Sequence, residues 1–322
     1  MTMQMGDGSA SEVLSQTPAS IPAPPTPTLV SRVKWVFLGP NGMRALWRLV
    51  LFLALVFAIR IPVNRLLHVS GRITEFTAKT VLVQDGAAFL VVLIASAIMG
   101  AFEKRSLATY GLPVRGAFGS RFFEGLVWGF VAESATMLTL YFTGTASFHG
   151  LAQHGTAALY FGAMWAAAFL AVGFFEELLF RGYPQFTLAT GISFWPAALL
   201  LSGLFWFAHM SNPGETWVGG LGAALAAVAF CLSLRLTGSL WFAIGMHAAW
   251  DWTETYFFGV ADSGMQANGH LLNTTLSGSK WMTGGTVGPE GSVIELIVVS
   301  AVIVLIFVRF RRPEPRLTAP LS

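Results

Sequence analysis

The sequence predicts an all-α fold, a polytopic transmembrane bundle of about eight helices. Of its 322 residues, 54% are hydrophobic and only 11% are charged, and the mean hydropathy is +0.64. These values are typical of a membrane protein that crosses the bilayer several times. The 27 Phe and 11 Trp residues agree with this class, because aromatic rings fill gaps between helices and anchor at the membrane interface.

Long apolar stretches give the positions of the spans. A hydrocarbon core about 30 Å thick requires roughly 20 helical residues. Segments of this kind occur at 46–66, 80–102, 122–143, 157–188, 194–210, 217–236, 238–258 and 292–310. The first has the least clean apolar core, since Arg48 and Arg60 shorten it.

These spans divide the chain into five regions. Residues 1–28 are small, polar and rich in proline, which predicts a disordered cytoplasmic tail. The tail lacks the basic and apolar regions of a signal peptide, so we expect the first span to be retained. The other regions are the N-terminal transmembrane helices (29–154), a core with several buried ionisable residues (155–258), a loop (259–291), and the last transmembrane helix with a basic tail (292–322).

Basic residues are distributed unevenly between the two sides of this map. Of the 19 Lys and Arg residues, 14 lie on one side of the membrane, and both chain termini lie on that same side. The positive-inside rule therefore predicts cytoplasmic termini, a cytoplasmic tail after the last helix and an external 259–291 loop. The first loop is basic and is an exception. We expect an integral, multi-pass protein of the plasma membrane, and its single cysteine, Cys231, excludes an intramolecular disulfide.

Adjacent carboxylates occupy the apolar stretch between residues 160 and 180. An ionisable group at bilayer depth costs from about 2.5 kcal/mol to several times that value, so Glu176 and Glu177 need partners. Glu177 and Arg181 lie at i and i+4 on one helical face, which predicts a charge-assisted pair. Glu176 points about 100° away and is left free.

Further candidate residues lie in two other spans. His209 follows Phe205 by one helical turn and should pack against it, and Asp251 follows His247 by the same spacing. A free carboxylate, two histidines and a second carboxylate can activate water and stabilise an oxyanion. If the fourth helix continues to about residue 189, Glu176, His209 and His247 reach comparable depths and can meet.

Other interpretations of these residues stay open. The same side chains could form a buried polar network that only holds helices together, as in transporters or assembly factors. Zinc could bind Glu176, His209 and His247, although a His-Glu-x-x-His helix is absent. We expect no cofactor on this basis. Asp85, Glu124 and Glu133 are also expected to be buried, each with a structural hydrogen bond.

Three motifs together resemble those of a known family. Glu176-Glu177-x-x-x-Arg181, Phe205-x-x-x-His209 and His247-x-x-x-Asp251 resemble, in order and approximate separation, the motifs of the CPBP family of intramembrane proteases. This family is also called the ABI or CAAX-protease and bacteriocin-processing family, and it includes the Rce1-type CAAX prenyl endopeptidases. The resemblance covers about residues 155–258.

The resemblance implies a function and site roles. Glu176 and His209 would position the attacking water, and His247 and Asp251 would be associated with oxyanion stabilisation. Prenyl-protein members typically have Asn at the last position. Since an ionised Asp251 cannot donate to an oxyanion, it would orient His247 or stay protonated. With Asp in place of Asn, CAAX-type processing is possible but not implied.

We therefore predict an intramembrane endopeptidase that cleaves a protein or peptide substrate with water activated by Glu and His. The catalytic residues would be Glu176, His209, His247 and Asp251, supported by Glu177, Arg181 and Phe205. The expected partners are the substrate and the lipid bilayer, and no nucleic acid. The alternative is a non-catalytic membrane protein, such as an immunity or partner-stabilising factor, with the same buried polar network.

Overall fold

The computed structural model describes residue 28 and residues 34–40, 42–67 and 75–311. The chain forms two compact units, Met1–Gly42 and Met43–Ser322. Short strands β1 (Leu38–Gly39) and β2 (Gly42–Met43) are found near the boundary between them. The predicted disordered tail, apart from residue 28, and the basic tail beyond residue 311 lie outside the described residues.

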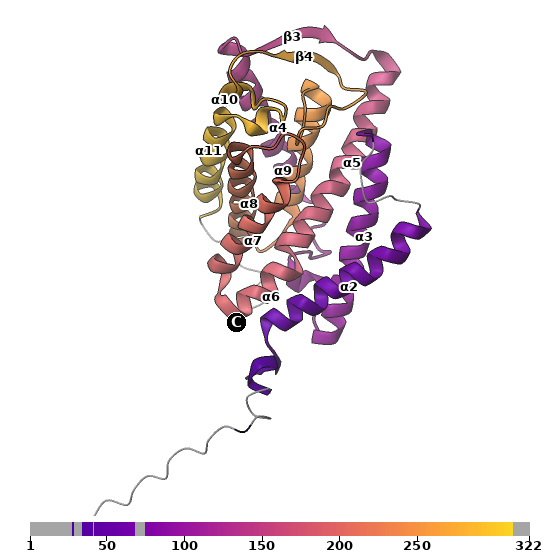
Figure 1. The fold of residues 1–322 in the computed structure, drawn as a ribbon, viewed down its shortest axis with the longest axis vertical. Coiled ribbons are helices and arrows are strands. Elements are labelled where there is room, and N and C mark those ends of the chain that lie inside the picture. Colours follow the sequence, from indigo (N-terminus) through magenta and orange to yellow (C-terminus); the bar gives the residue numbers. More distant parts are fainter. Residues whose placement is uncertain (1–27, 29–33, 41, 68–74, 312–322) are drawn as a thin grey trace, which may run out of the picture. The chain divides into compact units, whose positions relative to one another are not determined.

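The second unit is a helical bundle, which confirms the predicted polytopic membrane fold (Figure 1). Within the described residues, six helical segments are long and apolar enough to cross a membrane. They are α2 (Ala45–Leu66), α3 (Ala78–Glu103), α4 (Ser120–Phe142), α5 (Gly155–Arg181) with α6 (Tyr183–Ile192), α8 (Trp217–Thr237) and α11 (Val293–Phe310). The shorter α7 (Phe194–His209) and α9 (Trp241–Trp252), of 16 and 12 residues, occupy the other two predicted spans.

The expectation of one long fourth helix is wrong. Helix α5 ends at Arg181, and Gly182 leaves the helical conformation with ψ −127°. Helix α6 then starts with Pro184 in its first turn, where a residue without a backbone N–H is tolerated. The depth estimate that assumed a continuous helix to about residue 189 therefore loses its basis.

Helix α9 also ends earlier than expected. Its last residue is Trp252, and Thr253–Phe258 continue as a π-helical turn. A π-helical turn changes the direction in which successive side chains point, and such turns are frequent at functional sites. Glu254, in this turn, is fully buried.

Helix α9 is packed in the interior, against α4 and α5. Gly129 of α4 allows the close approach of the first pair, because an added Cβ there would collide with the backbone carbonyl of Met246. Phe242 and Ile244 of α9 are fully buried, each in a hydrophobic cluster. This central position makes α9 a rigid support for the side chains that it carries.

Strands β3 (Ala146–Leu151) and β4 (Leu272–Leu276) pair antiparallel across one end of the bundle, and α6 lies at the other end (Figure 1). The predicted 259–291 loop is therefore partly ordered, and it also contains α10 (Lys280–Thr283) and the 3-10 turn η3 (Pro289–Gly291). A further 3-10 turn, η1 (Leu107–Tyr110), follows α3. The strands depart from the all-α prediction because their pairing joins two segments more than 120 residues apart.

Candidate active site

Glu177 joins two helices at the centre of the site. Its Oε1 lies 3.2 Å from Nη1 of Arg181, and both side chains are almost completely buried. The predicted pair between these residues is therefore confirmed. The same oxygen accepts a hydrogen bond of 2.9 Å from Nδ1 of His247, on α9. Glu177, rather than Asp251, thus holds the imidazole in place.

The opposite ring nitrogen of His247 faces two other carboxylates. Its Nε2 lies 3.7 Å from Oε2 of Glu176 and 3.6 Å from Oδ2 of Asp251. Both distances exceed that of a direct hydrogen bond. Glu176 is the more accessible of the adjacent glutamates, with 23% of its side chain exposed against none for Glu177. Glu176, Glu177, Arg181, His247 and Asp251 are called the His247 group below.

His209 ends α7 and is held by its own helix. Its Nδ1 lies 2.8 Å from the carbonyl oxygen of Phe205, and its ring packs against that of Phe205, tilted by 39° with centroids 4.2 Å apart. The predicted packing of this pair is confirmed. Donation from Nδ1 leaves Nε2 as the acceptor. Phe205 also faces the guanidinium of Arg181, 4.5 Å from its ring centroid, so it links the first two motifs.

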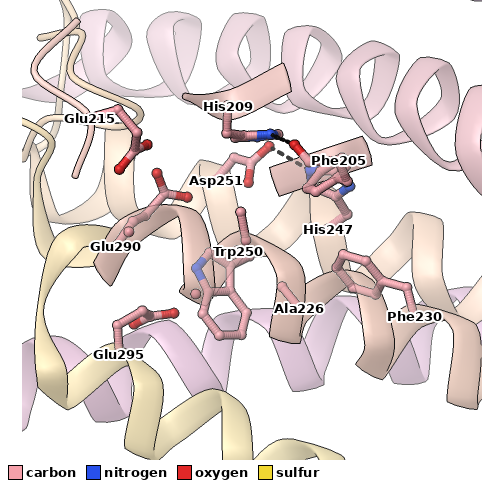
Figure 2. A pocket seen from close by; sticks show the side chains of 13 residues that line it. Phe205, His209, Glu215, Ala226, Phe230, His247, Trp250, Asp251, Glu290 and Glu295 are labelled. Carbon is pink, nitrogen blue, oxygen red and sulfur yellow. Dashed lines mark hydrogen bonds and ion pairs between the residues drawn. The ribbon is translucent and has the colours of Figure 1, made fainter. Parts of the chain in front are cut away.

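A cavity of about 60 Å³ connects part of these residues (Figure 2). His209, His247 and Asp251 line this cavity, whereas Glu176 and Glu177 do not. The cavity wall is therefore where His209 comes together with the His247 group. In the view of Figure 2, Glu215, Glu290 and Glu295 lie on the side away from Phe230. A volume of this size holds a few waters but no extended peptide.

Phe230 of α8 is a part of the site that sequence reasoning missed. Its ring stacks on the His247 imidazole, with centroids 5.2 Å apart, and lies 5.5 Å from the Arg181 guanidinium. The contact joins separate helices, and one apolar residue among many in α8 carries no signal for it. The role of Glu177 toward His247 was missed for the same reason.

A second set of carboxylates lies near the 259–291 segment, and two of them, Glu215 and Glu290, line the cavity. Burial raises the pKa of Asp262, and it raises the pKa of Glu290 well above its usual value with further repulsion from Asp262 and Asp251. Burial also raises the pKa of Glu215 in the α7–α8 connection. This accumulation was not predicted, although Glu254 continues the i, i+4, i+7 face of His247 and Asp251 and could have indicated it.

The prediction that Glu133 forms a structural hydrogen bond is wrong. This side chain of α4 is fully buried, and neither of its carboxylate oxygens has a hydrogen-bond partner among the described residues. Glu124 on the same helix does have partners, since it pairs with Arg121 and Arg309 at 2.8 Å each. Glu133 instead lies near the carboxylates of Glu295 and Glu290.

The alternative zinc set does not assemble. Among the described residues, one group of at least three His, Cys, Asp or Glu side chains has ligand atoms close enough for a shared ion, and it consists of Glu254, Asp262 and Glu290. Glu176, His209 and His247 do not form such a group.

The fold and these residues define an integral membrane protein of the multi-pass helical class with a buried ionisable site. Residues 157–253 match the family described as type II CAAX prenyl endopeptidase, Rce1-like. This match confirms the resemblance to the CPBP proteases, since all three motifs fall inside the matched segment. No curated protein matches the chain.

Proposed function

We propose that this protein is an intramembrane endopeptidase in which Glu176 acts as the general base. The observation that carries the proposal is that Glu176 Oε2 and Asp251 Oδ2 both lie within 3.7 Å of His247 Nε2, in a segment that matches Rce1-like endopeptidases. Glu176 forms no hydrogen bond in the described structure and is partly exposed, so its carboxylate is available to water. Arg181 neutralises Glu177 instead.

The remaining residues take complementary roles in this proposal. His209 would accept a hydrogen bond from the attacking water through Nε2, because Nδ1 is bound to the Phe205 carbonyl. His247 would donate to the oxyanion through Nε2, which requires the doubly protonated ring because Nδ1 already donates to Glu177. Asp251 would act with His247 at the oxyanion, as a proton donor when its carboxyl is protonated.

The substrate would be a protein or peptide segment that reaches the site from the membrane. The small cavity requires the helices to separate, or the scissile bond to enter at its mouth. On the neighbouring face of α9, an apolar groove of about 380 Å³ lies between α4 and α5, lined by residues such as Phe130, Leu170 and Trp252. An apolar segment or chain attached to a substrate could lie there.

A comparison of cellular proteomes tests the activity. Membranes and culture medium from cells with the wild-type protein should contain processed termini that disappear with Glu176→Gln. A general base contributes at least about 100-fold, so the loss should be nearly complete. Glu124→Gln is the matched control, since its side chain is similarly exposed (21%) and lies in an ion pair away from the site.

Both variants must also be recovered from the membrane with wild-type yield and thermal midpoint. If termini persist in Glu176→Gln, the protein does not use this carboxylate for hydrolysis. The alternative function, a non-catalytic immunity or partner-stabilising protein held together by the buried network, then takes its place.

The proposal includes an orientation with both termini cytoplasmic, supported by the distribution of basic residues. In a Cys231→Ser background, a cysteine at Ser277 should react with an impermeant thiol reagent in intact cells, whereas one at Ser322 should react only after lysis. The reverse labelling would invert the orientation and leave the catalytic assignment intact.

A further inference from the structure

A compact acidic group lies next to the cavity and outside the three motifs. Glu254 comes from the π-helical turn after α9, and Asp262 and Glu290 come from the segment that follows it. Ligand oxygens of the three carboxylates lie within 4.8 Å of one another. We call these three residues the acidic group.

Hydrogen bonds hold two members of the acidic group in position. Asp262 Oδ2 accepts a bond of 2.8 Å from the Thr255 hydroxyl. Glu290 Oε2 accepts from the backbone N–H and the hydroxyl of Ser263, at 3.0 and 3.1 Å. One oxygen of each carboxylate is thereby oriented by a neighbouring donor, as is usual for carboxylates that bind metal ions.

Glu254 provides an independent indication of a missing partner. Its side chain is fully buried, and both carboxylate oxygens lack a hydrogen-bond partner in the described part of the chain. Leaving a buried charge without a partner is highly unfavourable. The fully buried Glu133, also without a partner, lies close enough to repel it. None of the acidic group forms an ion pair with a described Lys, Arg or His side chain.

We propose that Glu254, Asp262 and Glu290 bind one hard divalent cation, with Ca²⁺ preferred over Mg²⁺. Ligand sets made only of carboxylate oxygens favour such ions, whereas zinc sites generally include His or Cys. Oxygens that share one Ca²⁺ at about 2.4 Å lie no more than about 4.8 Å apart, which the acidic group satisfies. The full burial of Glu254 disfavours Mg²⁺, because that ion retains several of its waters.

The bound cation joins the 259–291 segment to the end of α9. Glu290 also lines the cavity that contains His247 and Asp251, so the cation reduces the negative charge on one side of that cavity. It is a structural and electrostatic neighbour of the His247 group, and no step of the proposed hydrolysis passes through it. The inference is independent of the proposed protease activity, since binding can be measured without a substrate.

Calorimetric titration of the purified full-length protein tests this inference. After removal of divalent ions with EDTA and exchange into detergent buffer without chelator, CaCl₂ should bind at one ion per chain, and MgCl₂ at least about tenfold more weakly. Saturating Ca²⁺ should raise the thermal midpoint by at least about 3 °C, because a ligand that binds only the folded state stabilises it. Asp262→Asn should abolish both effects.

Glu295→Gln is the matched control for Asp262→Asn. Glu295 is a buried carboxylate that lines the same cavity, accepts a bond of 2.7 Å from Thr136 and lies outside the acidic group. Its variant should retain one Ca²⁺ per chain. Absence of saturable binding to the wild-type protein at millimolar Ca²⁺ would overturn the proposal even if Asp262→Asn did not fold. Equal binding by wild type and Asp262→Asn would also overturn it.

Discussion

The His247 group and the acidic group each contain three carboxylates but differ in charge balance. Around His247, three carboxylates share the site with the Arg181 guanidinium and an imidazole. Around Glu254, three carboxylates gather without an ion pair from any described cationic side chain. Burial is comparable in the two places, since Glu177 and Glu254 are both fully buried.

This difference separates two ways of tolerating a buried carboxylate. A charge that is buried with an oppositely charged partner is stable as long as the partner remains, and removing one member costs about 3–5 kcal/mol. A buried carboxylate without a partner must instead gain a proton or an external cation. Neutralising one carboxylate in each group should therefore change stability in opposite directions.

The largest effect is expected from Glu177→Gln. The substitution leaves Arg181 without its counter-charge and weakens the support of His247, so it should lower the free energy of unfolding by about 3–5 kcal/mol. Thermal unfolding in detergent measures this change, and activity should fall partly as a consequence. Asp251→Asn is the matched control, because Asp251 Oδ2 lies 3.6 Å from the ring and does not hold it.

The control variant should change stability by less than about 1 kcal/mol. If Asp251→Asn destabilises the protein as much as Glu177→Gln, the special stabilising role of Glu177 in the His247 group is contradicted. Asp251, and not Glu177, would then be the residue that positions His247.

A smaller effect of opposite sign is expected from Glu254→Gln in the presence of EDTA. The substitution removes one of three mutually repelling carboxylates, so it should raise the free energy of unfolding by about 1 kcal/mol, or roughly 2–4 °C in midpoint. With saturating Ca²⁺ the order should reverse, and the wild-type protein should be the more stable.

Parallel thermal scans of wild type and Glu254→Gln with EDTA and with Ca²⁺ show whether this crossover occurs. A variant that is less stable than wild type in EDTA would mean that Glu254 already has a stabilising partner. The two groups would then not differ in charge balance.

The sequence alone predicted the parts of this protein that depend on composition or on spacing within one helix. Hydropathy identified the membrane class, because about 20 apolar residues are needed to cross a bilayer wherever they occur. The pair between Glu177 and Arg181 and the packing of Phe205 on His209 followed from i, i+4 geometry. The three motifs, taken together, predicted the Rce1-like match.

Only the tertiary structure decided contacts between elements that are distant in the sequence. Gly182 and Pro184 end α5 inside a segment that is still apolar enough overall to count as one span, and helical periodicity gave no warning of the π-helical turn that carries Glu254. The choice of Glu177 as the partner of His247 depends on how α5 packs against α9. The acidic group depends on a fold that returns Asp262 and Glu290 to Glu254, because spacing along one helix determines neighbours on that helix and no others.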